Sequence, residues 1–145
     1  MVLATIDLNA DLAEECGDDE ALYPYLSSAN VCCGRHAGGV GAMKKAVTAA
    51  VRNDVVIGAH VGYEDRENFG RIEVEMDYDA LRKLTFDQIH DLLDVVNQAN
   101  AELKYVKPHG ALYHRMGNDP EQAAAVIDAV AEINPELHIL VPDTE

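Results

Sequence analysis

The sequence predicts an α/β fold built on a parallel sheet, and three observations support this prediction. Five short aliphatic segments alternate with segments of helical periodicity, a pattern that favours parallel strands joined by right-handed crossovers. Four of these aliphatic segments end in polar, chemically capable residues, as the site-bearing strand ends of parallel barrels do. A closed barrel needs roughly 200 residues or more. We therefore expect residues 1–145 to be one domain, either an open five-stranded sheet or, as we favour, the N-terminal part of a larger barrel.

The first half of the chain is expected to hold two strands and a helix. Residues 2–8 alternate loosely between aliphatic and polar side chains, which is typical of a strand. A second short strand is expected at Ala29–Cys33. Glycines then mark a loop that leads into a helix. Helical spacing places five side chains on the inward face of this helix: Val40, Met43, Val47, Ala50 and Val51.

The second half of the chain continues the alternation. Residues 55–60 form a continuous apolar run, as a fully buried strand does, and a long amphipathic helix is expected from about Asp79 to Ala101. Leu103–Lys107 is the fourth expected strand. Asp119 and Pro120 predict the cap and first turn of another helix, with Val126, Ile127, Val130 and Ile133 facing inward. Leu137–Val141 is the fifth expected strand.

The composition narrows the range of functions. The 26 acidic and 11 basic residues give a net charge of −15, which disfavours nucleic acid as a partner. No apolar run is long enough to predict a membrane span, and the N-terminus lacks the pattern of a secretory signal, so we expect a cytoplasmic protein without a membrane partner. Cys16, Cys32 and Cys33 do not form a disulfide framework and are expected to be buried, reduced thiols.

Polar residues at the first two strand ends form the first candidate site group. Asp7, Asn9 and Asp11 share one face of a strand and could act on a polarised substrate, a metal ion or an activated water, although Asn9 or Asp11 could instead cap a turn. Asp7 lies deeper in the strand and is expected to be structural. His36 follows the second strand in a glycine-rich loop, where Gly34 and Gly38 allow a ligand close to the backbone. A glycine-rich turn without a ligand remains open.

The third and fourth strands end in the second candidate group. His60 ends a strand that otherwise lacks polar side chains, and Lys107 and His109 flank Pro108, which fixes the end of the fourth strand. A lysine there can bind an anionic oxygen, and a histidine can transfer protons near neutral pH. A solvent-exposed lysine and a structural histidine are the plainer alternatives. The remaining histidines are not placed at strand ends: His90, His114 and His138.

Several motifs together resemble the LamB/YcsF family, which includes the A subunit of 5-oxoprolinase. They occur in the family's order and cover nearly the whole chain. The matching segments are Ile-Asp-Leu-Asn-Ala-Asp-Leu (6–12), Ser-Ser-Ala-Asn-Val (27–31), Cys-Gly-x-His-Ala-Gly (33–38), Ile-Gly-Ala-His-x-Gly-Tyr (57–63), Phe-Gly-Arg (69–71) and Val-Lys-Pro-His-Gly-Ala-Leu-Tyr (106–113).

The resemblance implies both a fold and an activity. The fold is an irregular parallel (β/α) barrel of the glycoside hydrolase and deacetylase type, and the family's proteins are longer than this chain. The activity is ATP-dependent opening of 5-oxo-L-proline to L-glutamate, with ATP and Mg as cofactors and 5-oxoprolinase subunits B and C as partners. Homo-oligomerisation stays open.

The resemblance also extends to individual residues. The hypothesis assigns catalysis to Asp11 and His60, which would position or deprotonate water, to His109, which would handle the departing ring nitrogen, and to Lys107, which would offset negative charge. The positions expected to bind substrate or nucleotide, or to support that site, are Asp7, Asn9, Asn30, Gly34, His36 and Gly38. Three departures from the family pattern put parts of the site in doubt: Arg35 replaces an aromatic residue, Gly39 an acid and Ala13 a glycine.

Two other functions stay open. A metal-dependent amide hydrolase of the deacetylase type would use Asp11, His36, His60 and His109 as ligands, because oxygen and imidazole donors suit zinc or manganese. A catalytically weakened protein that only docks partners would explain the short chain and the altered loop. Elemental analysis of the purified protein would distinguish the metal-dependent hydrolase from an ATP-coupled enzyme, because stoichiometric bound metal favours the metal-dependent hydrolase.

Overall fold

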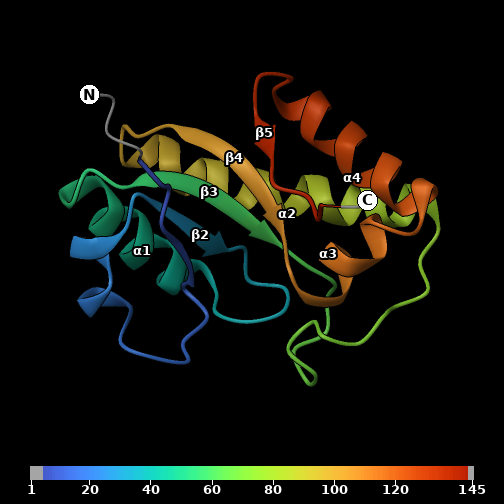
Figure 1. Cartoon of the computed structure of the whole chain (residues 1–145), viewed down its shortest axis with the longest axis horizontal. Helices are drawn as coiled ribbons and strands as arrows, with labels where there is room; N and C mark the ends of the chain where they lie inside the picture. Colours follow the sequence, from blue (N-terminus) through green and yellow to red (C-terminus); the bar gives the residue numbers. More distant parts are fainter. Residues whose placement is uncertain (1–4, 144–145) are drawn as a thin grey trace.

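A computed structural model describes residues 5–143 and shows a five-stranded parallel sheet at the centre of the molecule (Figure 1). The strands lie side by side in the order of the sequence. A (β/α) barrel has this sequential order, whereas a doubly wound sheet reverses its order part-way. The predicted α/β barrel class is therefore confirmed. The strands are β1 (Asn9–Leu12), β2 (Ser28–Cys32), β3 (Val56–Val61), β4 (Leu103–Pro108) and β5 (His138–Ile139).

Helices connect the strands and cover one face of the sheet. In the first connection, the chain makes two short 3₁₀ turns, η1 (Asp19–Ala21) and η2 (Tyr23–Tyr25). Both α1 and α2 pack against the strands, and α4 packs on α2 (Figure 1). None of the helices in residues 5–143 is long and apolar enough to cross a membrane. The helices are α1 (Val40–Arg52), α2 (Tyr78–Gln98), α3 (Gly110–Met116) and α4 (Pro120–Ile133).

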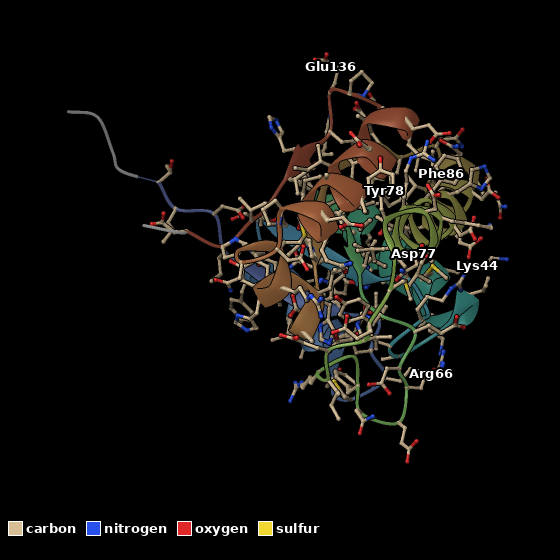
Figure 2. All side chains as sticks on the ribbon, turned by 90° about the vertical axis from the view of Figure 1, so that its right-hand side faces the viewer. Lys44, Arg66, Asp77, Tyr78, Phe86 and Glu136 are labelled. Atoms are coloured by element: carbon tan, nitrogen blue, oxygen red, sulfur yellow. The ribbon has the colours of Figure 1, made fainter. Side chains whose placement is uncertain are left out.

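Aspartates cap the first turns of α2 and α4, and a hydrogen bond joins the two helices. Asp77 caps α2 by accepting a hydrogen bond from the backbone N–H of Ala80 at 2.8 Å. The hydroxyl of Tyr78, labelled in Figure 2, donates to Asp128 of α4 at 2.6 Å. Asp119 caps α4 through the backbone N–H groups of Glu121 and Gln122, as the Asp-Pro pair predicts.

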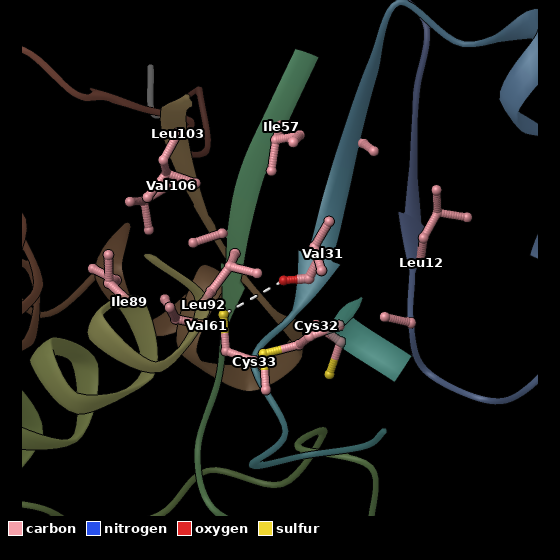
Figure 3. Close-up of a cluster of buried hydrophobic side chains, with 14 of the residues drawn as sticks. Leu12, Val31, Cys32, Cys33, Ile57, Val61, Ile89, Leu92, Leu103 and Val106 are labelled. Atoms are coloured by element: carbon pink, nitrogen blue, oxygen red, sulfur yellow. Dashed lines mark hydrogen bonds between the residues drawn. The ribbon is translucent and has the colours of Figure 1, made fainter. Parts of the chain in front are cut away.

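The core lies between the sheet and its helices. Successive side chains of a strand point to opposite faces, so alternate residues of β1 to β4 face the helices. Figure 3 shows this group of buried side chains: Leu12, Val31, Ile57, Val61, Leu103 and Val106 from the strands, with Ile89 and Leu92 from α2. Because this face supplies the apolar core, the opposite face of the same strands is free to carry polar side chains.

A β-bulge places two residues of β4 on the polar face. Ile57 pairs with Leu103, but the next residue, Gly58, pairs with Tyr105, so that Lys104 is the extra residue. A bulge of this kind shifts the alternation of a strand by one position. As a result Leu103 faces the helices, whereas Tyr105 and Lys107 lie on the same face as Asn30 and His60.

Some predictions about individual elements were wrong. The first strand is Asn9–Leu12, not residues 2–8; residues 2–4 lie outside the described part, and Ile6 is 87% exposed. Pairing with β2 begins at Asn9. The side chains of Asn9 and Asp11 accept hydrogen bonds from Asn30 of β2 on the polar face, and strand periodicity alone does not predict these contacts.

Neither α3 nor the 3₁₀ turns were predicted. Four side chains expected inside are exposed: Val40 and Val51 near the two ends of α1, Ile127 in the middle of α4, and Cys16 in a loop.

Gly58 gives the first testable prediction. A Cβ atom at this position would lie 2.2 Å from the ring of Tyr105, which crosses β3 to reach Asn30. We expect Gly58→Ala to lower the free energy of unfolding by about 1–3 kcal/mol, the usual cost of overpacking, in a denaturant titration. The matched control is Gly41→Ala on the exposed side of α1, where nothing lies within 4 Å; it should raise stability by about 0.5–1 kcal/mol. Equal effects of both substitutions would contradict this assignment of the Tyr105 ring.

Candidate functional site

The polar face of the sheet carries a connected network centred on Asp11. Lys107 Nζ donates to Asp11 Oδ1 at 2.6 Å, and Asn30 Nδ2 donates to the same oxygen at 2.8 Å. Asn30 Nδ2 also reaches Asn9 Oδ1 at 2.8 Å, and the Tyr105 hydroxyl donates to Asn30 Oδ1 at 2.6 Å. Burial alone would raise the pKa of Asp11, but His60, Lys107 and Asn30 outweigh it and hold that pKa well below its usual range. Asp11 is therefore an ionised carboxylate.

Three histidines meet beside this network. His60 is the next-to-last residue of β3, His109 precedes α3, and His36 lies in the loop after β2. The rings of His36 and His109 stack with centroids 3.8 Å apart, and His60 meets both edge-on. Burial lowers the pKa of His36, and it lowers the pKa of His109 to about 4. These two rings are thus neutral imidazoles near neutral pH.

Backbone carbonyls fix which nitrogen carries the proton in two of the rings. The Nδ1–H of His60 donates to the carbonyl oxygen of Lys107 at 2.9 Å, and the Nε2–H of His109 donates to that of Phe69 at 2.8 Å. The other two nitrogens, His60 Nε2 and His109 Nδ1, face each other at 3.0 Å. When both rings are neutral, both of these nitrogens are lone-pair acceptors; a proton on His60 Nε2, which also faces Asp11, makes that ring cationic.

A carboxylate that the sequence hypothesis left out, Glu14, completes this group. Its Oε1 lies 3.2 Å from His36 Nε2 and 3.7 Å from each of the facing nitrogens of His60 and His109. Glu14 follows β1, and its neighbours Ala13 and Glu15 have φ values of 64° and 56°. Left-handed backbone is costly for residues other than glycine and concentrates at functional sites. No local pattern distinguishes Glu14 from Glu15, so the sequence could not single it out.

One donor atom from each of Glu14, His36, His60 and His109 lies within 4.8 Å of the others. All four residues are buried. Carboxylate and imidazole donors in such a group could hold a divalent metal ion. Asp11, which the sequence hypothesis placed among the metal ligands, lies beside the group, with Oδ2 3.3 Å from His60 Nε2.

Close backbone packing holds the histidines in place. A Cβ atom at Gly62 would lie 2.8 Å from His36 Nδ1, and one at Gly70 would lie 2.9 Å from His36 Cβ and 3.0 Å from His109 Cδ2. Gly70 also has a φ of 63°, which favours glycine. The loop between β3 and α2 therefore presses directly on two of the rings.

The glycine-rich loop after β2 is held by Arg66, which is labelled in the loop between β3 and α2 in Figure 2. Arg66 Nη2 donates to the carbonyl oxygens of Gly34, at 2.9 Å, and Gly38. A Cβ atom at Gly38 would lie 1.9 Å from the carbonyl oxygen of Ala13. The two glycines thus serve close packing between the loops that carry His36 and Glu14; their role in binding substrate stays a prediction.

Most of the residues predicted for the site do converge. The structure brings together Asn9, Asp11, Asn30, His36, His60, Lys107 and His109. Asp7 lies at the exposed margin, where Oδ2 accepts a hydrogen bond from Ser28 Oγ at 2.8 Å. His90 faces Asp94 on α2 at 3.9 Å, and His114 and His138 are exposed. The separation of the six histidines into two groups of three matches the prediction.

The three departures from the family pattern have different structural settings. Arg35 pairs with Asp91 of α2 at 2.9 Å. Gly39 immediately precedes α1 and offers no side chain to cap it. Ala13 occupies the left-handed conformation that favours glycine, so this departure has a cost in backbone energy.

Comparison with known proteins places the chain in a family. Residues 6–145 match the LamB/YcsF family. The chain belongs to this family. It is 44% identical over 135 residues to the A subunit of 5-oxoprolinase from Histophilus somni and 46% identical over 142 residues to that from Corynebacterium efficiens. These alignments cover 93% and 94% of this chain.

A solved structure gives the same result for the fold. The crystal structure of a lactam utilization protein from Thermus thermophilus superposes with a TM-score of 0.93 at 36% identity, over 96% of this chain. The match covers 58% of that protein, and the two relatives are covered over 55% and 56% of their lengths. The chain thus spans a little over half the length of the proteins that it matches.

Ala13 provides a test of the backbone strain beside Glu14. We expect Ala13→Gly to raise the free energy of unfolding by roughly 0.5–1 kcal/mol. Relief of left-handed strain, about 1–2 kcal/mol, exceeds the about 0.4–1 kcal/mol lost to the greater freedom of unfolded glycine. In the same denaturant titration, the control Ala124→Gly inside α4 should lose about 1 kcal/mol. A comparable loss for Ala13→Gly would show that residue 13 is unstrained.

Proposed function

We propose that this chain forms part of a hydrolase that opens the lactam ring of 5-oxo-L-proline to give L-glutamate. The observation that carries the proposal is the convergence of most of the family's motif residues in one polar site, in which Asn30 and the three histidines are buried. The relatives named as 5-oxoprolinase components, and the lactam utilization protein of known structure, support the same substrate class.

The proposed reaction depends on ATP and on partner subunits. A lactam is a resonance-stabilised amide, so ATP with Mg would activate its carbonyl oxygen before water attacks. The relatives are named as one lettered subunit of an enzyme, which supports assembly with other subunits; we take these to be 5-oxoprolinase subunits B and C. The chain spans only part of the relatives' length, so residues outside it would complete the site.

The geometry supports distinct roles for the site residues. Asp11 is ionised, and the lone pair of His60 Nε2 lies 3.3 Å from it, so the two together can orient and deprotonate a water. Lys107 is partly exposed at the same carboxylate and would stabilise negative charge on the attacked carbonyl. The proton that His60 takes from the water would pass to His109 Nδ1, 3.0 Å away, and from His109 to the departing ring nitrogen. Asn30 and Asn9 orient Asp11, and His36 with the Gly34–Gly38 loop would border the substrate.

A second candidate is a metal-dependent amide hydrolase. The buried group of one glutamate and three histidines specifically favours it. In that reaction a cation, not His60, would activate the water. The third candidate, a protein that only docks partners, would not need the connected hydrogen-bond network that joins Lys107, Asp11 and Asn30.

Replacement of Lys107 tests the proposed role in lactam opening. We expect Lys107→Met in the full-length protein, assembled with its partner subunits, to reduce kcat for 5-oxo-L-proline by about 10²–10³-fold, the usual loss when one charge-stabilising group is removed. The control is Lys104→Met, because Lys104 lies on the same strand but pairs with Glu102 at the surface. Turnover that survives Lys107→Met at the control's level would favour the docking role.

A further inference from the structure

We propose that Glu14, His36, His60 and His109 bind one divalent metal ion of the zinc, cobalt or manganese class. The inference goes beyond lactam opening, because it concerns the donor atoms alone and holds for any substrate. It also differs from the metal site expected from the sequence, since Glu14 takes the place of Asp11 among the ligands.

Acceptor atoms converge at this point of the structure, where a positive charge is needed. When both rings are neutral, each donates its one ring N–H to a backbone carbonyl, so that His60 Nε2 and His109 Nδ1 present lone pairs to each other at 3.0 Å. Glu14 Oε1 lies 3.7 Å from both nitrogens. Two lone pairs and a carboxylate repel one another at such distances unless a proton or a metal ion lies among them, and we propose the metal ion.

The spacing of the donors also fits one ion. Zinc binds nitrogen and oxygen at about 2.0–2.2 Å, so neighbouring ligand atoms of a tetrahedral site lie about 3.4 Å apart. Four separations in the group are 3.0 Å between the facing nitrogens of His60 and His109, 3.2 Å from Glu14 to His36, and 3.7 Å from Glu14 to His60 and to His109, and all four donors lie within 4.8 Å of one another. The donors need only small movements to close on one ion.

The hydrogen bonds around the group are those that typically orient metal-binding histidines. Metal-binding histidines characteristically donate the second ring nitrogen to a carbonyl or carboxylate, which orients the ring. The carbonyls of Lys107 and Phe69 do this for His60 and His109. The side chains are also dry: exposed fractions are 8% for Glu14, 0% for His36, 1% for His60 and 6% for His109.

The third imidazole of the group belongs to His36. Within the described residues, Nδ1 of the fully buried His36 has no hydrogen-bond partner. Leaving such an atom unsatisfied is costly. His36 Nε2 is shared between Glu14 and the Cys32 thiol, which itself donates to the carbonyl oxygen of Ala37. The unpaired Nδ1 is not the nitrogen that faces Glu14, so it does not itself argue for a metal ion.

The donor set selects the class of ion. Three imidazoles and one carboxylate suit zinc, cobalt or manganese, whereas calcium and magnesium prefer oxygen ligands. The four donors fill a tetrahedral site, so a water would bind only as a fifth ligand. Asp11 and Lys107, which border the group, would then face the reacting water and substrate, and His60 and His109 would serve as ligands instead of transferring protons.

The test is metal binding itself, measured without substrate. Full-length protein stripped with a chelator is titrated with Zn²⁺ by calorimetry, and with Co²⁺ by visible absorption. We expect one ion per chain and a Co²⁺ spectrum of nitrogen and oxygen ligands. Glu14→Gln should weaken Zn²⁺ binding by at least about 100-fold, more than the loss of an outer partner causes. The neighbouring substitution Glu15→Gln should leave affinity unchanged.

Two further measurements keep the outcome decisive. Circular dichroism of the stripped variants shows whether each still folds, and His109→Gln should alter the Co²⁺ spectrum even where affinity is retained in part. Absence of stoichiometric binding, or equal affinity in Glu14→Gln and Glu15→Gln, would overturn the proposal and leave a shared proton as the bridging charge. Because no lactam is present, failure of 5-oxo-L-proline turnover would not affect this result.

Discussion

Two hydrogen bonds from imidazole rings to backbone carbonyls determine the chemistry of this protein's site. They fix the proton of His60 on Nδ1 and that of His109 on Nε2, and thereby turn two lone pairs toward a common space beside Glu14. Each carbonyl belongs to an element that the fold positions independently: Lys107 to β4, and Phe69 to the loop after β3. The character of the site, a set of converging acceptors, thus follows from backbone geometry.

The rest of the structure serves this arrangement. One face of the sheet is filled by the apolar core, which leaves the other for Asp11, Asn30 and His60. The bulge at Lys104 turns Tyr105 and Lys107 onto this polar face, and Gly58 provides room for the Tyr105 ring to reach Asn30. Gly70 lets the loop after β3 approach the histidines. The backbone on both sides of Glu14 is left-handed, and the Glu14 carboxylate lies 3.2–3.7 Å from the ring nitrogens of the three histidines.

Much of this could be predicted from the sequence, for a physical reason. Parallel strands place their carboxyl ends at one edge, so polar residues at the ends of separate aliphatic runs had to meet there; Asp11, His60, Lys107 and His109 were found in this way. The same reasoning rightly set aside His90, which sits on the solvent face of a helix. The order of the strands and the cap at Asp119 likewise depend on local patterns.

Other features depend on tertiary contacts that leave no local pattern. Glu14 lies in a turn whose left-handed residues are not glycines, so nothing separates it from Glu15 until the histidines are in place. The first strand was placed too early because its aliphatic residues, such as Ile6 and Leu8, are exposed, while the pairing with β2 begins at polar Asn9. The bulge in β4 shifts the alternation of faces and is likewise set by pairing with β3.

The most direct test is the protonation state of the two rings, which ¹⁵N-edited NMR of histidine-labelled protein reports at each nitrogen. We predict a proton on Nδ1 of His60 and on Nε2 of His109 at neutral pH, with the facing nitrogens free of a directly bonded proton when Zn²⁺ is present. A proton on Nε2 of His60 that persists at saturating Zn²⁺ would contradict the proposed arrangement of converging acceptors.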